Sequence, residues 1–179
     1  MNNISKYMKI CDIIANEFSK CLSRKIGCLI LTADHTIIAT GYNGPPRKVN
    51  HCDSIERLEW IVPQLKRTHV GDIKSYLVEN GWGNKCPRHI LKFKSGEGLW
   101  ACQAGHAERN AIDNCSREGI KIKGCWLILN APLPCQECTK SIIGAGITKV
   151  VCKAGPDYDA GSRWLLEQAG IEIIQIGEI

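Results

Sequence analysis

The sequence contains no long hydrophobic run. Its apolar stretches are short, as at residues 27–31, whereas a membrane-spanning helix needs about 20 mostly apolar residues. Residues 1–9 are polar and charged where a secretory signal peptide would carry an apolar segment. These two absences argue against a membrane protein and against an exported one. We therefore expect a cytoplasmic protein with no membrane partner.

The sequence also lacks a block of like charges. Its 179 residues include 23 Lys and Arg against 18 Asp and Glu, and the net charge of +5 is spread along the chain. Proteins that bind nucleic acid normally carry a clustered basic stripe, so no nucleic-acid partner is expected. The mild positive charge suits a small anionic ligand better. The length and the 44% hydrophobic content predict a single domain over residues 1–179.

Cysteine, in contrast, is plentiful. The chain has 11 cysteines, an odd number that cannot all pair within one chain. A reducing cytosol keeps such thiols from forming stable disulfides. The sequence therefore predicts metal binding as the main use of its cysteines.

Hydrophobic periodicity predicts a helix, a hairpin, and then alternating strands and helices. The expected helices are residues 4–21, 55–65, 73–78, 106–117, 135–145 and 162–169. The expected strands are residues 25–31, 36–42, 124–129, 149–153 and 171–176. Strands that alternate with helices imply parallel pairing and right-handed crossovers in the C-terminal part. Residues 81–98 look like a long loop, which would need a metal to hold it.

Two short motifs stand at the starts of predicted helices. An H-x-E motif contains His106 and Glu108, and a P-C-x-x-C motif contains Cys135 and Cys138. Together they form the signature of zinc-dependent nucleobase deaminases. One imidazole and two thiolates leave the fourth tetrahedral position of zinc open for water, as catalytic zinc requires. Cys135 and Cys138 are one helical turn apart, and a helix N-terminus favours their thiolate forms.

Glu108 is the expected proton carrier. It follows the ligand His106 by two residues and would not point fully in the same direction on a helix, so it need not bind the metal. Its expected role is to take a proton from water, pass it to ring N3, and protonate the departing amine. A structural zinc half-site or a redox pair would account for C-x-x-C alone, but neither accounts for His106 and Glu108.

Beyond these motifs, the sequence resembles the deoxycytidylate (dCMP) deaminase family over most of its length. The short zinc motifs are shared with tRNA adenosine, cytosine and cytidine deaminases, whereas the GYNG and HAExNAI forms point to dCMP. Residues 130–133 depart from the family pattern. The similar stretches are residues 21–27, 40–44, 51–53, 106–112, 141–147, 150–151, 157–159 and 169–171.

The resemblance implies a cytidine-deaminase-like α/β fold, a three-layer α/β/α sandwich around a central five-stranded mixed sheet. It also implies a homo-oligomer, as a hexamer or dimer, and allosteric control by dCTP and dTTP, with Mg²⁺ accompanying the effector nucleotide.

Four residues are expected to contact the substrate on the basis of this resemblance. Asn43 would contact the deoxyribose, Asn110 would orient the sugar or a nearby loop, and Tyr158 would close over the sugar-phosphate. Arg24 is the candidate for the 5′-phosphate, because a guanidinium suits bidentate binding of phosphate. The alternatives are that Asn43 only caps a turn and that Arg24 is an ordinary surface cation.

The resemblance also motivates a second, structural zinc, which longer relatives carry between GYNG and HAE. It would stabilise an insertion at about residues 47–104, and four protein ligands would close it to water. The alternative is a set of unligated thiols that pack as small apolar groups. The preferred ligands are Cys21, His51, Cys86 and Cys102, with Cys52 in place of His51 and His89 in place of Cys86 as alternatives.

We therefore expect a zinc-dependent hydrolase that converts dCMP to dUMP and ammonia and so supplies dUMP for dTMP synthesis. Another cytosine nucleotide, dCTP or a 5-substituted dCMP, is the alternative substrate. A nonenzymatic zinc-stabilised interaction module is the alternative from another class of protein, and RNA editing is disfavoured by the dispersed charge. Cys11, Cys28, Cys115, Cys125 and Cys152 are expected to be buried as small apolar residues.

Overall fold

The computed structural model describes residues 4–65, 72–94 and 96–177. The chain divides into two compact units. The sheet unit is formed by the N-terminal residues to Ser19, by residues 25–43 and by the chain from His106 onwards. The insertion unit is formed by residues 20–24 and 44–105. Residues 66–71 and 95 of the expected insertion lie outside the described residues.

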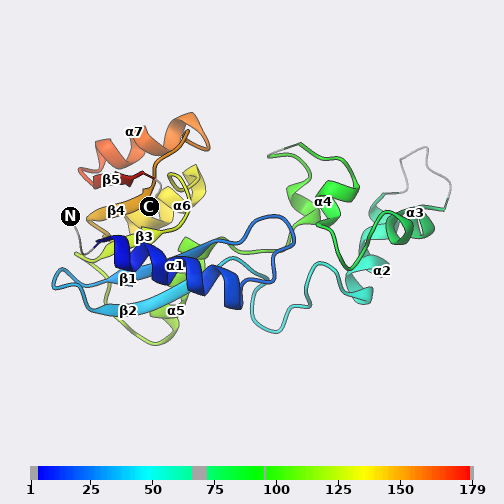
Figure 1. The fold of residues 1–179 in the computed structure, drawn as a ribbon, viewed down its shortest axis with the longest axis horizontal. Coiled ribbons are helices and arrows are strands. Elements are labelled where there is room, and N and C mark those ends of the chain that lie inside the picture. The colour runs from blue at the N-terminus through cyan, green and yellow to red at the C-terminus, as the bar shows by residue number, and fades with distance from the viewer. Residues whose placement is uncertain (1–3, 66–71, 95, 178–179) are drawn as a thin grey trace. The chain divides into compact units, whose positions relative to one another are not determined.

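The sheet unit contains five strands and four helices among the described residues (Figure 1). The strands are β1 (Gly27–Leu31), β2 (Ile37–Tyr42), β3 (Trp126–Leu129), β4 (Lys149–Lys153) and β5 (Glu172–Ile176). The helices are α1 (Ile4–Phe18), α5 (Ala107–Arg117), α6 (Gln136–Gly144) and α7 (Ala160–Gln168). Each of these elements confirms a predicted one, with small differences at the ends.

The five strands form one mixed sheet in the order β2-β1-β3-β4-β5. The predicted hairpin is confirmed, since β1 pairs antiparallel with β2, and β1 also pairs antiparallel with β3. The predicted parallel pairing is confirmed for β3 with β4 and for β4 with β5. Parallel neighbours require crossover connections, and α6 and α7 provide them.

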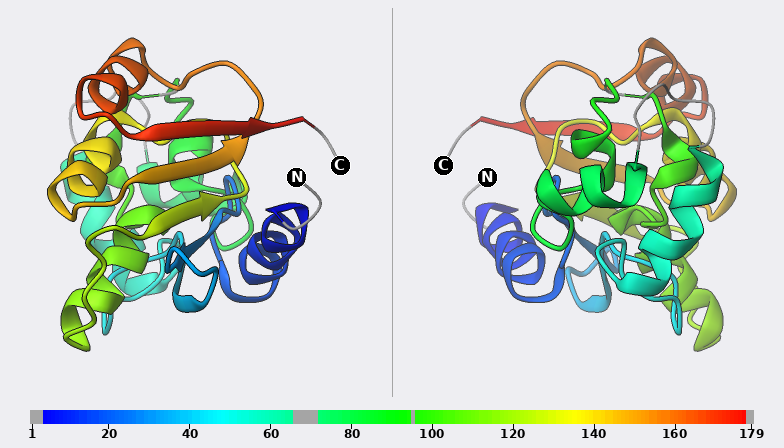
Figure 2. Two further views of the ribbon diagram at one scale, coloured as in Figure 1. Left: turned by 90° about the vertical axis from the view of Figure 1, so that its left-hand side faces the viewer. Right: turned by 90° about the vertical axis from the view of Figure 1, so that its right-hand side faces the viewer.

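Helices cover both faces of this sheet (Figure 2). On one face, α1 buries Met8, Cys11 and Ile14 against Leu29 and Ile128. On the other face, α5, α6 and α7 bury residues that include Ala111, Ile142 and Leu166. The alternation of side chains along each strand supplies apolar groups to both faces, so the sheet is buried from both sides. The expected α/β class with a five-stranded mixed sheet between helices is confirmed.

Two glycines allow helices to approach the sheet closely. A Cβ on Gly27 in β1 would lie 2.1 Å from the carbonyl oxygen of Cys11 in α1. A Cβ on Gly41 in β2 would lie 2.2 Å from the carbonyl oxygen of Ala107, at the start of α5. Any side chain at either glycine would therefore push a helix away from the sheet.

The insertion unit has its own small core. Its elements are α2 (Ile55–Gln64), α3 (Ile73–Glu79), α4 (Pro87–Ile90) and a 3₁₀ turn, η1 (Leu99–Ala101). The core consists of Leu58, Ile61, Leu65, Leu77, Ile90 and Ala101. The expected loop at residues 81–98 is thus interrupted by α4. A proline at its first position starts this helix, which is too short for a helical hydrophobic period to appear in the sequence.

Across the described ranges, we find no helix both long and apolar enough to cross a membrane.

Candidate active site

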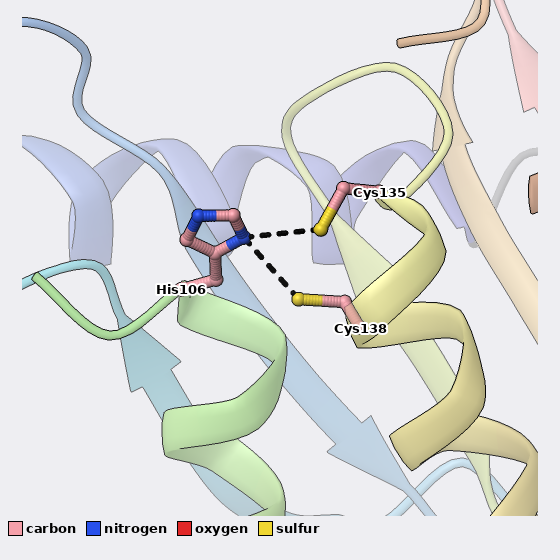
Figure 3. Close-up of side chains that lie close together, drawn as sticks. All are labelled: His106, Cys135 and Cys138. Atoms are coloured by element: carbon pink, nitrogen blue, oxygen red, sulfur yellow. Dashed lines mark hydrogen bonds between the residues drawn. The ribbon is translucent and has the colours of Figure 1, made fainter. Parts of the chain in front are cut away.

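Three predicted metal ligands lie together in the sheet unit (Figure 3). The Nδ1 atom of His106 is 3.3 Å from the Sγ atom of Cys135 and 3.3 Å from the Sγ atom of Cys138. The three ligand atoms all lie within 4.8 Å of one another. In residues 4–65, 72–94 and 96–177, no other group of three or more His, Cys, Asp or Glu side chains meets this distance.

The starts of two helices position these ligands. His106 is the N-cap residue of α5, and Cys135 is the N-cap residue of α6. Cys138 lies in the first turn of α6, so its sulfur returns to the same side as that of Cys135. The one-turn spacing therefore brings both sulfurs to the same imidazole nitrogen.

The electrostatics of this cluster suit a cation. Hydrogen bonds from the Cys138 thiol and from His106 lower the pKa of Cys135 to about 4, against the opposing effect of burial. The hydrogen bond with Cys135 in turn raises the pKa of His106. The cluster therefore favours the thiolate form of Cys135, which is the form that binds a metal.

The donor set fits zinc. Imidazole nitrogen and thiolate sulfur are the ligands that zinc favours, and three protein ligands are typical of a catalytic site. His106 is exposed, Cys135 is half-buried and Cys138 is buried, so solvent reaches the cluster from the His106 side.

Glu108 lies in the first turn of α5, where only 4% of its surface is exposed. Burial raises the pKa of its carboxyl group, while the nearby His106 and a hydrogen bond with Cys138 act in the opposite direction. Glu108 is not one of the three clustered ligands. This placement agrees with a carboxyl group beside the metal site that does not itself bind the metal.

Asn43 is buried, and its side chain joins segments that are separate in the sequence. Its Oδ1 atom accepts a hydrogen bond from the backbone N–H of Ile26 at 2.8 Å and one from the Ser19 hydroxyl at 2.7 Å. These long-range hydrogen bonds are not those of a turn cap, and the contact of Asn43 with deoxyribose stays a prediction. Ser19 was missed, because a serine after a helix carries no signal of a partner 24 residues away.

Asn110 connects α5 to β2. Its side-chain amide donates a hydrogen bond to the carbonyl oxygen of Tyr42 at 2.7 Å, and Asn114, one turn later, donates to that of Thr40 at 2.8 Å. The two amides attach the helix that carries Glu108 to an edge strand of the sheet. The predicted role of Asn110 in orienting the sugar stays a prediction.

The two remaining substrate candidates are both exposed. Tyr158 precedes α7 in the sheet unit, and 53% of its surface is exposed. Arg24 lies on the surface of the insertion unit. The proposed contacts of Tyr158 with the sugar-phosphate and of Arg24 with the phosphate stay predictions.

The candidate ligands of the second zinc all belong to the insertion unit. Burial raises the pKa of the Cys52 thiol to about 12, and negative charge on nearby groups adds to the effect. These groups are Cys86, Asp53, Cys21 and Cys102. His51, the preferred candidate, places its Nδ1 atom 2.9 Å from a carboxylate oxygen of Asp53. The Nδ1 atom of His51 also lies 3.7 Å from the Sγ atom of Cys52, so the choice between these two neighbouring ligand candidates stays a prediction.

The sequence was compared with known proteins. Residues 1–154 match the family described as the cytidine and deoxycytidylate deaminase zinc-binding region. The chain is 32% identical over 180 residues to the deoxycytidylate deaminase of Enterobacteria phage T2, covering 98% of this chain and 93% of the relative. It is also 32% identical over 177 residues to the deoxycytidylate deaminase of Enterobacteria phage T4, covering 96% of this chain and 89% of the relative.

A solved structure has the same fold. The dCMP deaminase of cyanophage S-TIM5, in complex with dCMP and dUMP, superimposes with a TM-score of 0.62 at 22% identity. The match covers 96% of this chain and 95% of the other. Together with the His106, Cys135 and Cys138 cluster, the family match leads to one conclusion. The chain belongs to the cytidine and deoxycytidylate deaminase family of zinc-binding deaminases.

Proposed function

We propose that this protein is a zinc-dependent hydrolase that converts dCMP and water to dUMP and ammonia. The observation that carries the proposal is the cluster of His106, Cys135 and Cys138 with the buried Glu108 two residues from the imidazole. The arrangement contains three metal ligands and a separate proton carrier, which are the parts that hydrolytic deamination needs.

The proposed division of labour follows from these residues. His106, Cys135 and Cys138 would hold zinc, which supplies an open coordination position and lowers the pKa of water there towards about 7. Glu108 takes a proton from the attacking water and delivers it to ring N3. The new C4–O bond forms, and Glu108 then takes the proton of the resulting C4 hydroxyl group and gives it to the amino group. The C4–N bond breaks, the C4 carbonyl of dUMP forms and ammonia leaves.

The choice of dCMP draws on the relatives. The similar phage proteins are named deoxycytidylate deaminases, and the S-TIM5 structure of the same fold contains dCMP and dUMP. The dispersed net charge of +5 is compatible with a small anionic substrate. Control by dCTP and dTTP, Mg²⁺ beside such an effector, and assembly into a hexamer or dimer stay predictions of the resemblance. A cytoplasmic location stays a prediction from the sequence.

Ammonia release from a panel of nucleotides tests the substrate. The panel contains dCMP, CMP, dCTP, deoxycytidine and 5-methyl-dCMP, and dCMP is expected to give the highest kcat/KM. A higher value for dCTP or 5-methyl-dCMP would replace dCMP as the substrate while leaving the zinc chemistry in place. Zinc-loaded protein that releases ammonia from none of them would favour the nonenzymatic interaction module.

We also propose a second, structural zinc in the insertion unit, held by Cys21, Cys86, Cys102 and either His51 or Cys52. Its support is that these candidates occur in one compact unit and that the His51 Nδ1 atom lies 3.7 Å from the Cys52 Sγ atom. Their sulfur atoms are not gathered to within 4.8 Å of one another in the described structure, so zinc would have to draw them together. Two zinc ions per chain is then the expected content.

A further inference from the structure

The N-terminus of α6 carries both thiol ligands of the candidate metal site. Cys135 is the N-cap residue, and Cys138 lies in the first turn. Any shift of this helix end would displace both sulfurs relative to His106, which stands on α5. The position of one helix end therefore determines the geometry of the site.

The N-cap residue of α6 has its side chain engaged elsewhere. An N-cap side chain normally supplies an oxygen that accepts hydrogen bonds from the first-turn N–H groups. Cys135 has no such oxygen, and its sulfur lies 3.3 Å from the Nδ1 atom of His106. The first N–H group of α6, that of Gln136, therefore needs an acceptor from another part of the chain.

Asp159 supplies that acceptor. Its Oδ2 atom accepts a hydrogen bond from the backbone N–H of Gln136, the first residue of α6, at 2.7 Å. Its Oδ1 atom accepts hydrogen bonds from the backbone N–H of Ser162 at 3.1 Å and from the Ser162 hydroxyl at 2.7 Å. Asp159 is also the N-cap residue of α7. One carboxylate thus joins the starts of two helices.

The charge of Asp159 suits this position. Burial opposes its ionisation, but the hydrogen bonds from Ser162 and Gln136 hold the pKa of the carboxyl group below its usual value. Two helix N-termini point at the same carboxylate, and the partial positive charge of each favours an anion there. Asp159 is therefore ionised at neutral pH.

The surrounding structure keeps this carboxylate in place. Gly161, in the first turn of α7, lies so close to Gln136 that a Cβ would be 2.6 Å from its Nε2 atom. On the N-terminal side, Asp157 makes a two-point ion pair with Arg163 at 2.8 and 2.9 Å, and Arg163 also donates to Gln175 of β5. The start of α7 is thus fixed both to α6 and to the sheet.

We propose that Asp159 is a positioning residue that holds the N-terminus of α6, and with it the Cys135 and Cys138 sulfurs, in the geometry that binds the metal. The inference rests on the zinc site of the proposed function but not on the choice of dCMP as substrate. It explains why a carboxylate outside the metal site accepts hydrogen bonds from two helices at once.

The Asp159→Ser variant separates this role from the capping of α7. Serine is a good N-cap residue, so α7 keeps its cap, whereas the hydroxyl is too short to reach Gln136 as well. Zinc-loaded protein is treated with a chelator and iodoacetamide, and alkylation of Cys135 is followed by mass spectrometry. Loss of an outer partner of a metal site costs about 10- to 100-fold in affinity, so Cys135 is expected to react about 10-fold faster or more.

Matched controls make the result specific. Asp157→Asn breaks the ion pair with Arg163 on the same loop and is expected to leave alkylation of Cys135 at the wild-type rate. Asp159→Asn, which is nearly isosteric and replaces one of the two acceptor oxygens by an amide nitrogen, is the second variant if Asp159→Ser does not fold.

Two outcomes would overturn the inference. One is a wild-type alkylation rate at Cys135 in both Asp159 variants. The other is an equal acceleration in Asp157→Asn, since this would mean that any loosening of the loop exposes the site. A protein that deaminates a different nucleotide, but shows the expected protection of Cys135, would disprove the dCMP proposal and leave this inference standing.

Discussion

Five cysteines without an assigned metal role are buried in the core of the sheet unit, as the sequence predicted. They are Cys11, Cys28, Cys115, Cys125 and Cys152. Burial raises the pKa of Cys11 and that of Cys152 to about 12, so both stay neutral thiols. Cys135 differs, because hydrogen bonds with Cys138 and His106 lower its pKa to about 4. The partners of each sulfur, rather than the residue type, determine whether it is a metal ligand or a core group.

Glu108→Gln is expected to abolish most of the deaminase activity while zinc stays bound. The amide keeps the size and the buried position of the side chain but cannot carry the proton, and general acid–base catalysis contributes roughly 100- to 10,000-fold. The measurement is kcat with dCMP together with zinc content by mass spectrometry. Glu118→Gln, at the exposed end of the same helix, is the control and should keep wild-type activity. Unchanged turnover in Glu108→Gln would refute the proposed mechanism.

At the scale of secondary-structure elements, the site depends on how α5 and α6 are held. α5 is fixed to β2 by close packing at Gly41 and by the side-chain amides of Asn110 and Asn114. α6 is fixed at its start by Asp159. Each ligand-bearing helix is therefore attached near its N-terminus, where the ligands are, which limits their movement relative to each other.

Gly41→Ala is expected to destabilise the protein and to lower its activity. The new methyl group would meet backbone atoms of Ala107 and Ala111 at 2.2 and 2.5 Å, so α5 must move, and overpacking of this kind costs about 1–3 kcal/mol. Thermal unfolding and kcat with dCMP are the measurements. Gly144→Ala in α6 adds a methyl group with no atom within 4 Å and should leave both values close to wild type. A wild-type melting temperature for Gly41→Ala would contradict the close approach.

At the scale of the whole molecule, the chain forms two compact units. The sheet unit contains the candidate active site, and the insertion unit contains the four thiols of Cys21, Cys52, Cys86 and Cys102. Among the described residues, the insertion unit has a core of six buried residues. A core of this size contributes little stability, and small units commonly rely on a structural metal. The proposed second zinc would meet this need.

Metal analysis of purified, fully active protein is expected to give two zinc ions per chain. Cys86→Ser should reduce the content to one and lower the melting temperature, because binding energy at a structural site is folding energy. Cys125→Ala, which removes a core thiol of the sheet unit, should keep both ions. A content of one zinc in fully active wild-type protein would rule out the second site.

The sequence by itself determined the strands and helices of the sheet unit and the three clustered ligands. Both depend on local spacing: hydrophobic periods mark the elements, and the one-turn separation of Cys135 and Cys138 places both sulfurs on one side of a helix. Helix α4 escaped prediction because four residues are too few to show a period.

Only the tertiary structure decided which distant side chains meet. The contact of Asp159 with Gln136 spans 23 residues, and that of Ser19 with Asn43 spans 24. It likewise brought the Asn114 side chain of α5 to the Thr40 carbonyl oxygen of β2, 74 residues away in the sequence. No local pattern encodes such pairs, because they arise when packed elements bring separate segments together.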